Sequence, residues 1–381
     1  MADVVSFAVE LAQQLIRENT INPPGHETRC VSILKPILSR AGFFLEERSF
    51  GDGRSSLIAR IPGASRNSDA LAFTGHVDTV PLGVEEWTVD PFGAEIRDGR
   101  LYGRGSCDMK AGIAAFISAC IQKRDQLTSG SGALLIITAA EETGCEGAFA
   151  LMKESALQEG ARALIVAEPT DNYPLIGHKG ALWLNASAKG VTAHGSMPEK
   201  GVNAIVKAVK AASRLDRFRL NCPCHSVLGA PTLNIGTFKG GQNINSVPDA
   251  AEFTIDIRTV AGQSHDGVCS ALEGLFGEEI RLERILDVGA VWSDPEDPFI
   301  KIVIQVMEQV LGEKYETRAA TYFTDAAFLK PALGDVPTVV LGPGHPSMAH
   351  QTDEYCSVTR IDQAVDAYIK VIDATEHLVN R

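Results

Sequence analysis

The chain has 381 residues, of which 45% are hydrophobic and 22% charged, and this suits a globular protein of about two domains. Its formal net charge of −13 argues against nucleic acid or an anionic membrane as a partner, because phosphate-rich surfaces attract basic patches. The sequence contains no stretch of about 18 uncharged apolar residues, so no transmembrane span is predicted.

The first 20 residues carry apolar side chains at helical spacing and lack the basic-then-apolar order of a signal peptide. The eight cysteines are scattered without a CxxC motif. Cys222 and Cys224 are the one close pair, and their spacing is shorter than that of a usual zinc site. These features predict a cytoplasmic protein with reduced thiols.

Helical patterns alternate with short apolar runs over the first 175 residues. The predicted strands are 56–61, 70–74, 133–138 and 163–167, and the predicted helices include 110–122 and 147–157. This alternation predicts an α/β fold with a mostly parallel sheet flanked by helices. Ligand sites in such sheets gather at the carboxyl ends of the strands.

The pattern of apolar and polar residues changes near Lys179. Alternating residues predict strands at 181–188, 232–238, 252–258 and 279–288, with helices at 203–214 and 265–276. This pattern indicates an antiparallel sheet with one face covered by helices. The alternation of helical and strand patterns then resumes, with a helix at 300–311, a strand at 337–341 and a last helix at 360–378. We therefore expect a discontinuous metal-binding domain, 1–178 and 290–381, and an inserted smaller α+β domain, 179–289.

His76 and Asp78 follow the apolar run 70–74. Residues two apart point to the same side of an extended chain, so both side chains can face one pocket. That arrangement suits a metal-bound imidazole with a carboxylate beside it. The alternative is a buried histidine that only fills space and makes hydrogen bonds.

Further acidic residues occur at comparable places. Asp108 lies in a glycine-rich segment before an apolar helix, while Glu141, Glu142 and Glu168 each follow an apolar strand pattern. Each has an ordinary alternative. Asp108 can be a helix N-cap, the adjacent glutamates a solvated helix start, and Glu168 an acid in a turn before a proline.

A polar segment at 345–354 follows the last predicted strand and contains His350, with a surface loop as its alternative reading. Together the motifs supply two imidazoles and several carboxylates at strand ends of one sheet. This donor set suits two divalent ions of the zinc type, with one carboxylate bridging. Two such ions that share a water make a hydrolytic nucleophile, and a further carboxylate is then needed as general base.

The ordered motifs HxD, GRGxxDMKxG, EExG, EP and a late histidine resemble one family over essentially the whole chain. It is the acetylornithine deacetylase / succinyl-diaminopimelate desuccinylase / aminoacylase / carboxypeptidase G family of dinuclear zinc amidohydrolases. The resemblance implies that His76 and Glu168 hold one metal ion. It implies that Glu142 and His350 hold the other, and that Asp108 bridges the two.

The resemblance also assigns the groups around the metals. Asp78 is expected to orient His76 as its carboxylate partner. Glu141 is expected to take a proton from the bridging water and pass it to the leaving amine, although the residues alone leave Glu141 and Glu142 interchangeable. By the same resemblance, the peptide bond between Asp108 and Met109 is expected to be cis.

The inserted domain resembles the family's lid. By that resemblance, His194 reaches the site of the partner subunit and stabilises the oxyanion. Asn245 and Arg258 are expected to bind substrate, the arginine by gripping a carboxylate, and Thr324 to lie on a substrate loop. Taken singly, His194 can be an exposed loop histidine and Arg258 a surface cation. Residues 322–323 are aromatic where many relatives have glycines, which affects the expected shape of the substrate pocket.

The prediction is therefore an enzyme that hydrolyses the amide bond of an N-acyl amino acid, of the deacetylase/desuccinylase type. The net charge of −13 mildly favours a cationic, acetylornithine-like substrate. The expected cofactors are two divalent metal ions, zinc with cobalt as a substitute, and a homodimer through the inserted domain is expected.

Two alternatives remain. One is a dipeptidase or carboxypeptidase on the same dinuclear site. The other is a binding protein that kept the fold and lost the chemistry. This second alternative predicts a missing ligand or base, whereas all the candidates are present.

Overall fold

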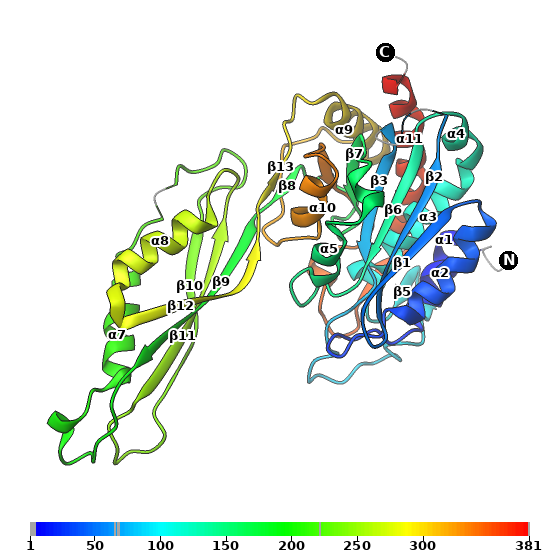
Figure 1. Cartoon of the computed structure of the whole chain (residues 1–381). Coiled ribbons are helices and arrows are strands. Elements are labelled where there is room, and N and C mark those ends of the chain that lie inside the picture. Colours follow the sequence, from blue (N-terminus) through cyan, green and yellow to red (C-terminus); the bar gives the residue numbers. More distant parts are fainter. Residues whose placement is uncertain (1–4, 65, 67–68, 221, 380–381) are drawn as a thin grey trace. The chain divides into compact units, whose positions relative to one another are not determined.

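The chain divides into two compact units in the computed structural model, which describes residues 5–64, 66, 69–220 and 222–379. Unit 1 comprises Met1–Gly177, Trp292–Ala320 and Thr324–Arg381, and unit 2 comprises His178–Val291 and Thr321–Phe323. Figure 1 shows the chain coloured along the sequence. The sequence pattern did not assign the three residues 321–323 to the inserted segment.

Unit 1 contains a six-stranded sheet of order β1-β2-β6-β3-β7-β14. Its strands are β1 (Phe44–Gly51), β2 (Arg54–Pro62), β3 (Leu71–His76), β6 (Gly132–Thr138), β7 (Ala163–Val166) and β14 (Thr338–Val340). Strands β6, β3, β7 and β14 run parallel, and β1 and β2 join antiparallel. The mostly parallel sheet is thus confirmed. Strand β1 was not predicted, because it is an edge strand whose charged sequence lacks an apolar face.

Helices cover both faces of this sheet. They are α1 (Phe7–Ile16), α2 (Thr28–Arg40), α3 (Ala111–Gln122), α4 (Arg124–Ser129), α5 (Glu146–Leu151), α6 (Ser155–Gln158), α9 (Pro298–Leu311), α10 (Ala326–Ala332) and α11 (Val358–Val379). Buried residues of α1, α2, α3, α9 and α11 share one core, whereas α10 packs against β7 and α5. The prediction of a single helix at 147–157 is wrong. Glu154 has an extended backbone there and pairs with Arg48 of β1, which divides the segment into α5 and α6.

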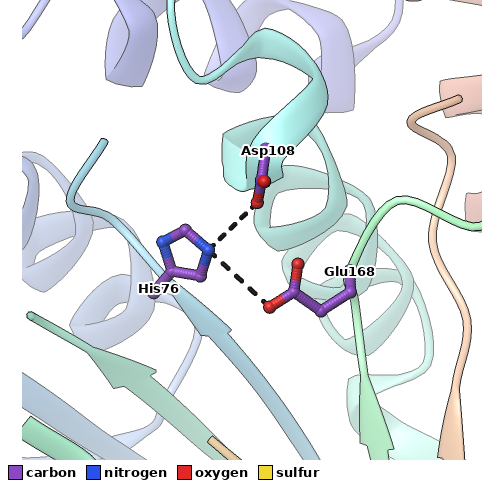
Figure 2. A group of neighbouring side chains, drawn as sticks. All are labelled: His76, Asp108 and Glu168. Atoms are coloured by element: carbon purple, nitrogen blue, oxygen red, sulfur yellow. Dashed lines mark hydrogen bonds and ion pairs between the residues drawn. The ribbon is translucent and has the colours of Figure 1, made fainter. Parts of the chain in front are cut away.

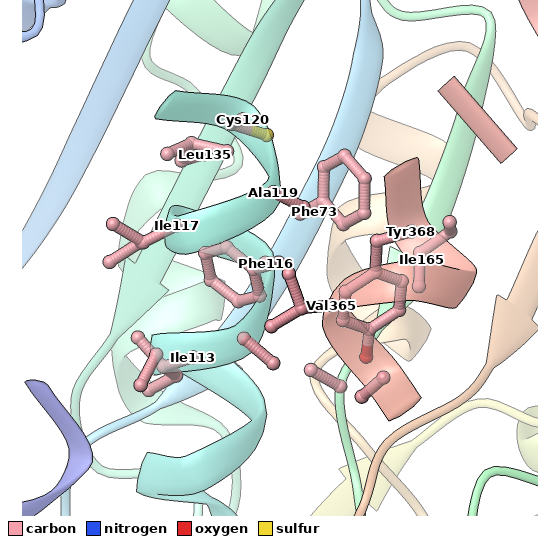
Figure 3. Close-up of a cluster of buried hydrophobic side chains, with 14 of the residues drawn as sticks. Phe73, Ile113, Phe116, Ile117, Ala119, Cys120, Leu135, Ile165, Val365 and Tyr368 are labelled. Carbon is pink, nitrogen blue, oxygen red and sulfur yellow. The ribbon is translucent and has the colours of Figure 1, made fainter. Parts of the chain in front are cut away.

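Aromatic packing holds the centre of the main core (Figure 3). The ring of Phe73 on β3 stacks on Phe116 of α3, with the centroids 5.6 Å apart. It also meets the edge of Tyr368 of α11 at 5.5 Å. The Tyr368 hydroxyl donates a hydrogen bond to the carbonyl oxygen of Leu341, just after β14, at 2.5 Å. One strand and two helices from distant parts of the chain therefore meet at Phe73.

A small three-stranded sheet, β15-β5-β4, lies in the same unit. Its strands are β4 (Ile96–Arg97), β5 (Arg100–Tyr102) and β15 (Tyr355–Ser357). Tyr355 pairs with Tyr102 in an antiparallel register, and the N–H of Gly103 donates to the carbonyl oxygen of Glu354 at 2.9 Å. The late segment that contains His350 is thereby tied to the glycine-rich segment that contains Asp108.

Unit 2 contains a four-stranded antiparallel sheet of order β10-β11-β9-β12 with two helices. Its elements are β9 (Gly180–Lys189), α7 (Ala204–Leu215), β10 (Thr232–Gly240), β11 (Ala250–Thr259), α8 (His265–Phe276) and β12 (Ile280–Val288). Alternate residues of β9 and β11 are buried against α7 and α8, as the period-two pattern predicts. Short strands β8 (Gly177–His178) and β13 (Val291–Trp292) pair where the chain passes between the units. Among the described residues, no helix combines the length and apolar character needed to cross a membrane.

The aromatic cluster generates a stability prediction. Phe73→Ala removes a fully buried ring and leaves a cavity, so the free energy of unfolding should fall by about 3–5 kcal/mol. Guanidinium unfolding measures the loss. The matched control is Phe44→Ala on β1 of the same sheet, where the ring is 70% exposed and the expected change is within about 0.5 kcal/mol. Equal losses in the two variants would contradict this account of the core.

Candidate metal centre and active site

Four of the predicted residues lie at the carboxyl ends of adjacent parallel strands. His76 is the last residue of β3, Glu141 and Glu142 follow β6, and Glu168 follows β7. Because β6, β3 and β7 are neighbours in the sheet, their ends meet at one edge. Asp108 reaches the same place from an irregular turn, η2 (Ser106–Lys110), that immediately precedes α3.

The first group of potential metal ligands comprises His76, Asp108 and Glu168 (Figure 2). Nε2 of His76 lies 3.1 Å from Oδ1 of Asp108 and 3.7 Å from Oε1 of Glu168. One ligand atom from each residue lies within 4.8 Å of the others, which is a spacing that a single cation can bridge. One imidazole nitrogen and two carboxylates form a donor set suited to a divalent ion of the zinc type.

The second group comprises Asp108, Glu142 and His350. Nε2 of His350 lies 3.4 Å from Oδ2 of Asp108 and 3.2 Å from Oε2 of Glu142. The two carboxylate oxygens of Asp108 therefore face two different histidines. Half of the His350 side chain is exposed, and its backbone is left-handed at φ 64°, a conformation uncommon outside glycine and often found at functional sites.

Asp78 holds three parts of this centre. Nδ1 of His76 lies 3.0 Å from the carbonyl oxygen of Asp78, which can only accept, so this nitrogen carries a proton and Nε2 is the one turned toward Asp108 and Glu168. The carboxylate accepts hydrogen bonds from the N–H groups of Glu141 at 3.1 Å and Glu142 at 3.2 Å. It also accepts one from Nδ2 of Asn22 at 3.0 Å. Sequence reasoning missed Asn22, because no motif surrounds it.

The acid–base properties of the ligands agree with a cation site. Burial and the neighbouring negative charge of Asp108 raise the pKa of Glu168 well above its usual value. Hydrogen bonds to Asp108 and Glu142 raise the pKa of His350 to about 10. Oε1 of Glu142 is buried and has no hydrogen-bond partner among the described residues. The raised pKa values reflect an excess of buried negative charge, which a divalent cation could offset.

Glu141 belongs to neither of the two groups of potential ligands. Its side chain is buried, and this burial raises the pKa of its carboxyl group well above the ordinary value. Sγ of Cys145 lies 3.7 Å from its Oε1. The carboxyl group of Asp325 is also buried, which raises its pKa to about 6, and it accepts a 2.5 Å hydrogen bond from Thr138. The contacts of Asp325 were not predicted, because it is distant in sequence from the other acids.

The structure also decides between the readings that the sequence left open. Asp108 is not a helix cap, since α3 begins at Ala111 and no side chain caps it. The two glutamates do not start a helix, because α5 begins only at Glu146. Glu168 is 4% exposed, so it is not an acid of a solvated turn. The peptide bond between Asp108 and Met109 is cis, as expected.

The predicted lid residues lie mostly in unit 2. His194 and Asn245 occupy adjacent exposed loops, where the N–H of Gly195 donates to the carbonyl oxygen of Asn245 at 2.7 Å. Nδ1 of His194 lies 2.7 Å from the hydroxyl of Ser196. Thr324 is fully buried in unit 1.

Arg258 of β11 belongs to a separate set of contacts in unit 2. Its Nε lies 3.0 Å from Oδ1 of Asp256. Its guanidinium lies 6.0 Å from the ring centroids of both Trp183 and Phe323. The indole N–H of Trp183 donates to Asp256 at 2.9 Å, so one carboxylate orients both side chains.

Known proteins resemble this chain over most of its length. A family model described as peptidase family M20/M25/M40 matches residues 72–374. Acetylornithine deacetylase of Proteus mirabilis is 32% identical over 372 residues, which cover 93% of each chain. Succinyl-diaminopimelate desuccinylase 2 of a Ruegeria species is 32% identical over 380 residues, which cover 96% of this chain and 94% of that protein.

Among solved structures, the M20 family metallo-carboxypeptidase Sso-CP2 of Sulfolobus solfataricus has a TM-score of 0.80. It is 17% identical, and the match covers 98% of this chain and 100% of that one. At this level of identity the likeness concerns the fold, which extends over both units.

The raised pKa values generate a prediction about metal binding. His76, His350 and Glu168 have raised pKa values in the metal-free chain, so each holds a proton at a pH below its own pKa and must lose it to bind a cation. Metal affinity should therefore rise with pH up to about 10, the pKa of His350, and binding below that pH should release protons. Calorimetric titration with zinc in two buffers of different ionisation enthalpy measures the release. Affinity independent of pH, with no proton released, would contradict the predicted ligand set.

Proposed function

The chain belongs to peptidase family M20/M25/M40, and on this premise we propose that it removes the acyl group from an N-acyl amino acid with the help of two divalent ions. The proposal rests on the position of Asp108, whose carboxylate has one oxygen facing His76 and the other facing His350. Two relatives at 32% identity are named as a deacetylase and a desuccinylase, which supports a deacylase with an acetylornithine-like substrate.

The proposed ligand assignment follows the two groups. His76 and Glu168 hold one ion, Glu142 and His350 hold the other, and Asp108 is shared. The ions are proposed to be zinc, which cobalt can replace, because imidazole and carboxylate donors suit both. When bound, a pair of such ions makes water a nucleophile near neutral pH and polarises the amide carbonyl.

Glu141 is the proposed general base. It is buried next to the ligands without contributing to either group, and a raised pKa suits a carboxylate that must accept a proton at neutral pH. It takes a proton from the attacking water and delivers it to the amide nitrogen as the carbon–nitrogen bond breaks. The Asp78 carboxylate accepts the N–H of Glu141, and the Asp78 carbonyl oxygen accepts from the ring of His76, so one residue holds both the base and the ring.

The proposed substrate contacts come from the residues that resemble the family's lid. His194 is a donor for the negative charge that develops on the carbonyl oxygen. Arg258 binds the substrate carboxylate, and its position beside Asp256 and Trp183 supports a preset orientation of the guanidinium. Asn245 and Thr324 bind the rest of the substrate. In this proposal unit 1 is the catalytic domain and unit 2 the lid and dimerisation domain.

The proposal includes a homodimer through unit 2 and a cytoplasmic location. Apolar side chains are exposed on α7, where Val206 is 47% and Val209 50% exposed, and on the edge strand β10, at Ile235 and Phe238. Exposed apolar residues on one element are typical of a contact surface. All eight cysteines lie in the part of the chain that the structure describes, and each is free, as expected of a reducing compartment.

The first test is the release of free amine with zinc or cobalt supplied. The compounds are N-acetylornithine, N-succinyl-diaminopimelate, neutral N-acetyl amino acids and several dipeptides. Glu141→Gln should lower kcat about 10²- to 10⁴-fold and keep metal binding, because it removes the base and none of the ligands. The matched control is Glu146→Gln, an exposed glutamate five residues away, which should keep full activity. Release from dipeptides alone would favour the peptidase alternative, and release from none of the compounds would contradict the proposal.

The second test concerns assembly. Val206→Glu combined with Val209→Glu should convert a dimer into a monomer, because burying two carboxylates in an apolar contact is unfavourable. Sedimentation velocity gives the mass of each form. The matched control is Phe44→Glu, an exposed aromatic position in unit 1, which should leave the dimer intact. A wild-type chain that sediments as a monomer would refute the dimer.

A further inference from the structure

A buried ion pair between Arg104 and Glu354 lies beside the candidate metal centre. Both side chains are 1% exposed, and Nη1 of Arg104 lies 2.7 Å from Oε2 of Glu354. An ion pair removed from water adds little net stability unless further hydrogen bonds satisfy its charges. The other partners of the two side chains therefore indicate what the pair does.

The partners of Glu354 all belong to the segment that carries Asp108. Besides Arg104, its Oε2 accepts the N–H of Gly105 at 3.0 Å. Its Oε1 accepts the N–H of Cys107 at 2.8 Å and the N–H of Asp108 at 3.0 Å. One carboxylate thus holds the backbone on which the shared ligand is mounted, including the amide group of the ligand itself.

The partners of Arg104 belong to two other segments of the centre. Nη1 also donates to the carbonyl oxygen of Gln351, the residue after His350, at 3.2 Å. Nη2 donates to the carbonyl oxygen of Pro81, three residues after Asp78, at 3.1 Å. The guanidinium lies over the ring of Trp87 at 5.1 Å, in the same stretch of chain. The ion pair therefore joins the segment after β3, the turn of Asp108 and the segment of His350.

We propose that Glu354, through Arg104 and the turn at 105–108, is a positioning residue that sets Asp108 relative to His350 and so determines the affinity of the centre for both cations. Glu354 lies four residues after His350, so the same short segment supplies a ligand and the support of the shared carboxylate. The inference rests on the proposed function, because it requires two ions around Asp108. A pair that only stabilised the fold would leave metal affinity unchanged in the folded protein.

Glu354→Gln tests the inference with little change in shape. The amide keeps one acceptor oxygen but turns an NH2 group toward donors, so the contacts of the other oxygen and the charge are lost. We expect the affinity for Co²⁺ to fall about 10- to 100-fold, as for other residues that orient metal ligands. The visible absorption of bound Co²⁺ should shift as its coordination geometry changes. The value of kcat should fall while KM for the best substrate stays nearly constant.

The matched control is Glu27→Gln in the same unit. Glu27 is a fully buried carboxylate paired with Arg54 at 2.9 Å, and its other hydrogen bond comes from the N–H of His26. This variant loses a buried arginine–carboxylate pair without touching a candidate ligand. It should unfold at lower denaturant concentration but bind Co²⁺ within about twofold of wild type. If Glu354→Gln does not fold, Glu354→Asp keeps the charge, shortens the reach and is measured in the same way.

The inference is overturned if the folded Glu354 variant binds two Co²⁺ ions with the affinity and spectrum of wild type and only its unfolding midpoint falls. It is also overturned if the Glu27 control loses Co²⁺ affinity to the same degree. The wild-type protein alone tests the proposed function. That function fails if wild type binds fewer than two Co²⁺ ions, or if it releases amine from none of the compounds.

Discussion

Repulsion between buried carboxylates is the constraint on which the rest of this structure depends. Glu141, Glu142 and Glu168 meet Asp78 and Asp108 at one edge of the unit 1 sheet, largely removed from water. Such a group is stable only where hydrogen bonds, protons or cations offset the negative charge. The carboxylate of Asp78 is stabilised by hydrogen bonds from backbone and amide N–H groups. That of Asp108 lies between two imidazoles. Burial raises the pKa values of Glu141, Glu142 and Glu168, so their negative charges are only partly offset by the groups around them.

The same constraint separates the roles of the carboxylates. Those with donors around them are fixed in position, and those without donors are available for a cation or a proton. Asp78 and Glu354 belong to the first kind, because backbone N–H groups occupy their oxygens. Glu142, with a buried oxygen that has no donor among the described residues, belongs to the second. Hydrogen bonding thus distinguishes the acids proposed to support the centre from those proposed to bind a cation or a proton.

Much of the fold and of the candidate centre follows from local sequence, because the proposed ligands lie directly after apolar strands or before an apolar helix. His76, Glu142 and Glu168 belong to such motifs, and parallel neighbours must end at a common edge. The supporting residues could not be predicted in this way. Asn22 donates a hydrogen bond to Asp78, 56 residues away in the sequence. Glu354 accepts one from the N–H of Asp108, 246 residues away. Such contacts depend on the assembled fold, and no periodicity or spacing records them. The edge strand β1 was missed because none of its residues is buried and its charged sequence lacks an apolar face.

The insertion of unit 2 also fixes when the centre is completed during synthesis. Domains generally fold as units, beginning with the N-terminal part of the chain. Unit 2 is complete at Val291 apart from residues 321–323, whereas unit 1 still lacks β14, the loop of His350 and helix α11. Until residue 354 has left the ribosome, the turn of Asp108 has neither its second histidine nor the carboxylate that holds its backbone. From the synthesis of Glu168 to that of Glu354 the nascent chain therefore exposes an unfinished, acidic sheet edge, a period in which chaperones or early cation binding would have their largest effect on yield.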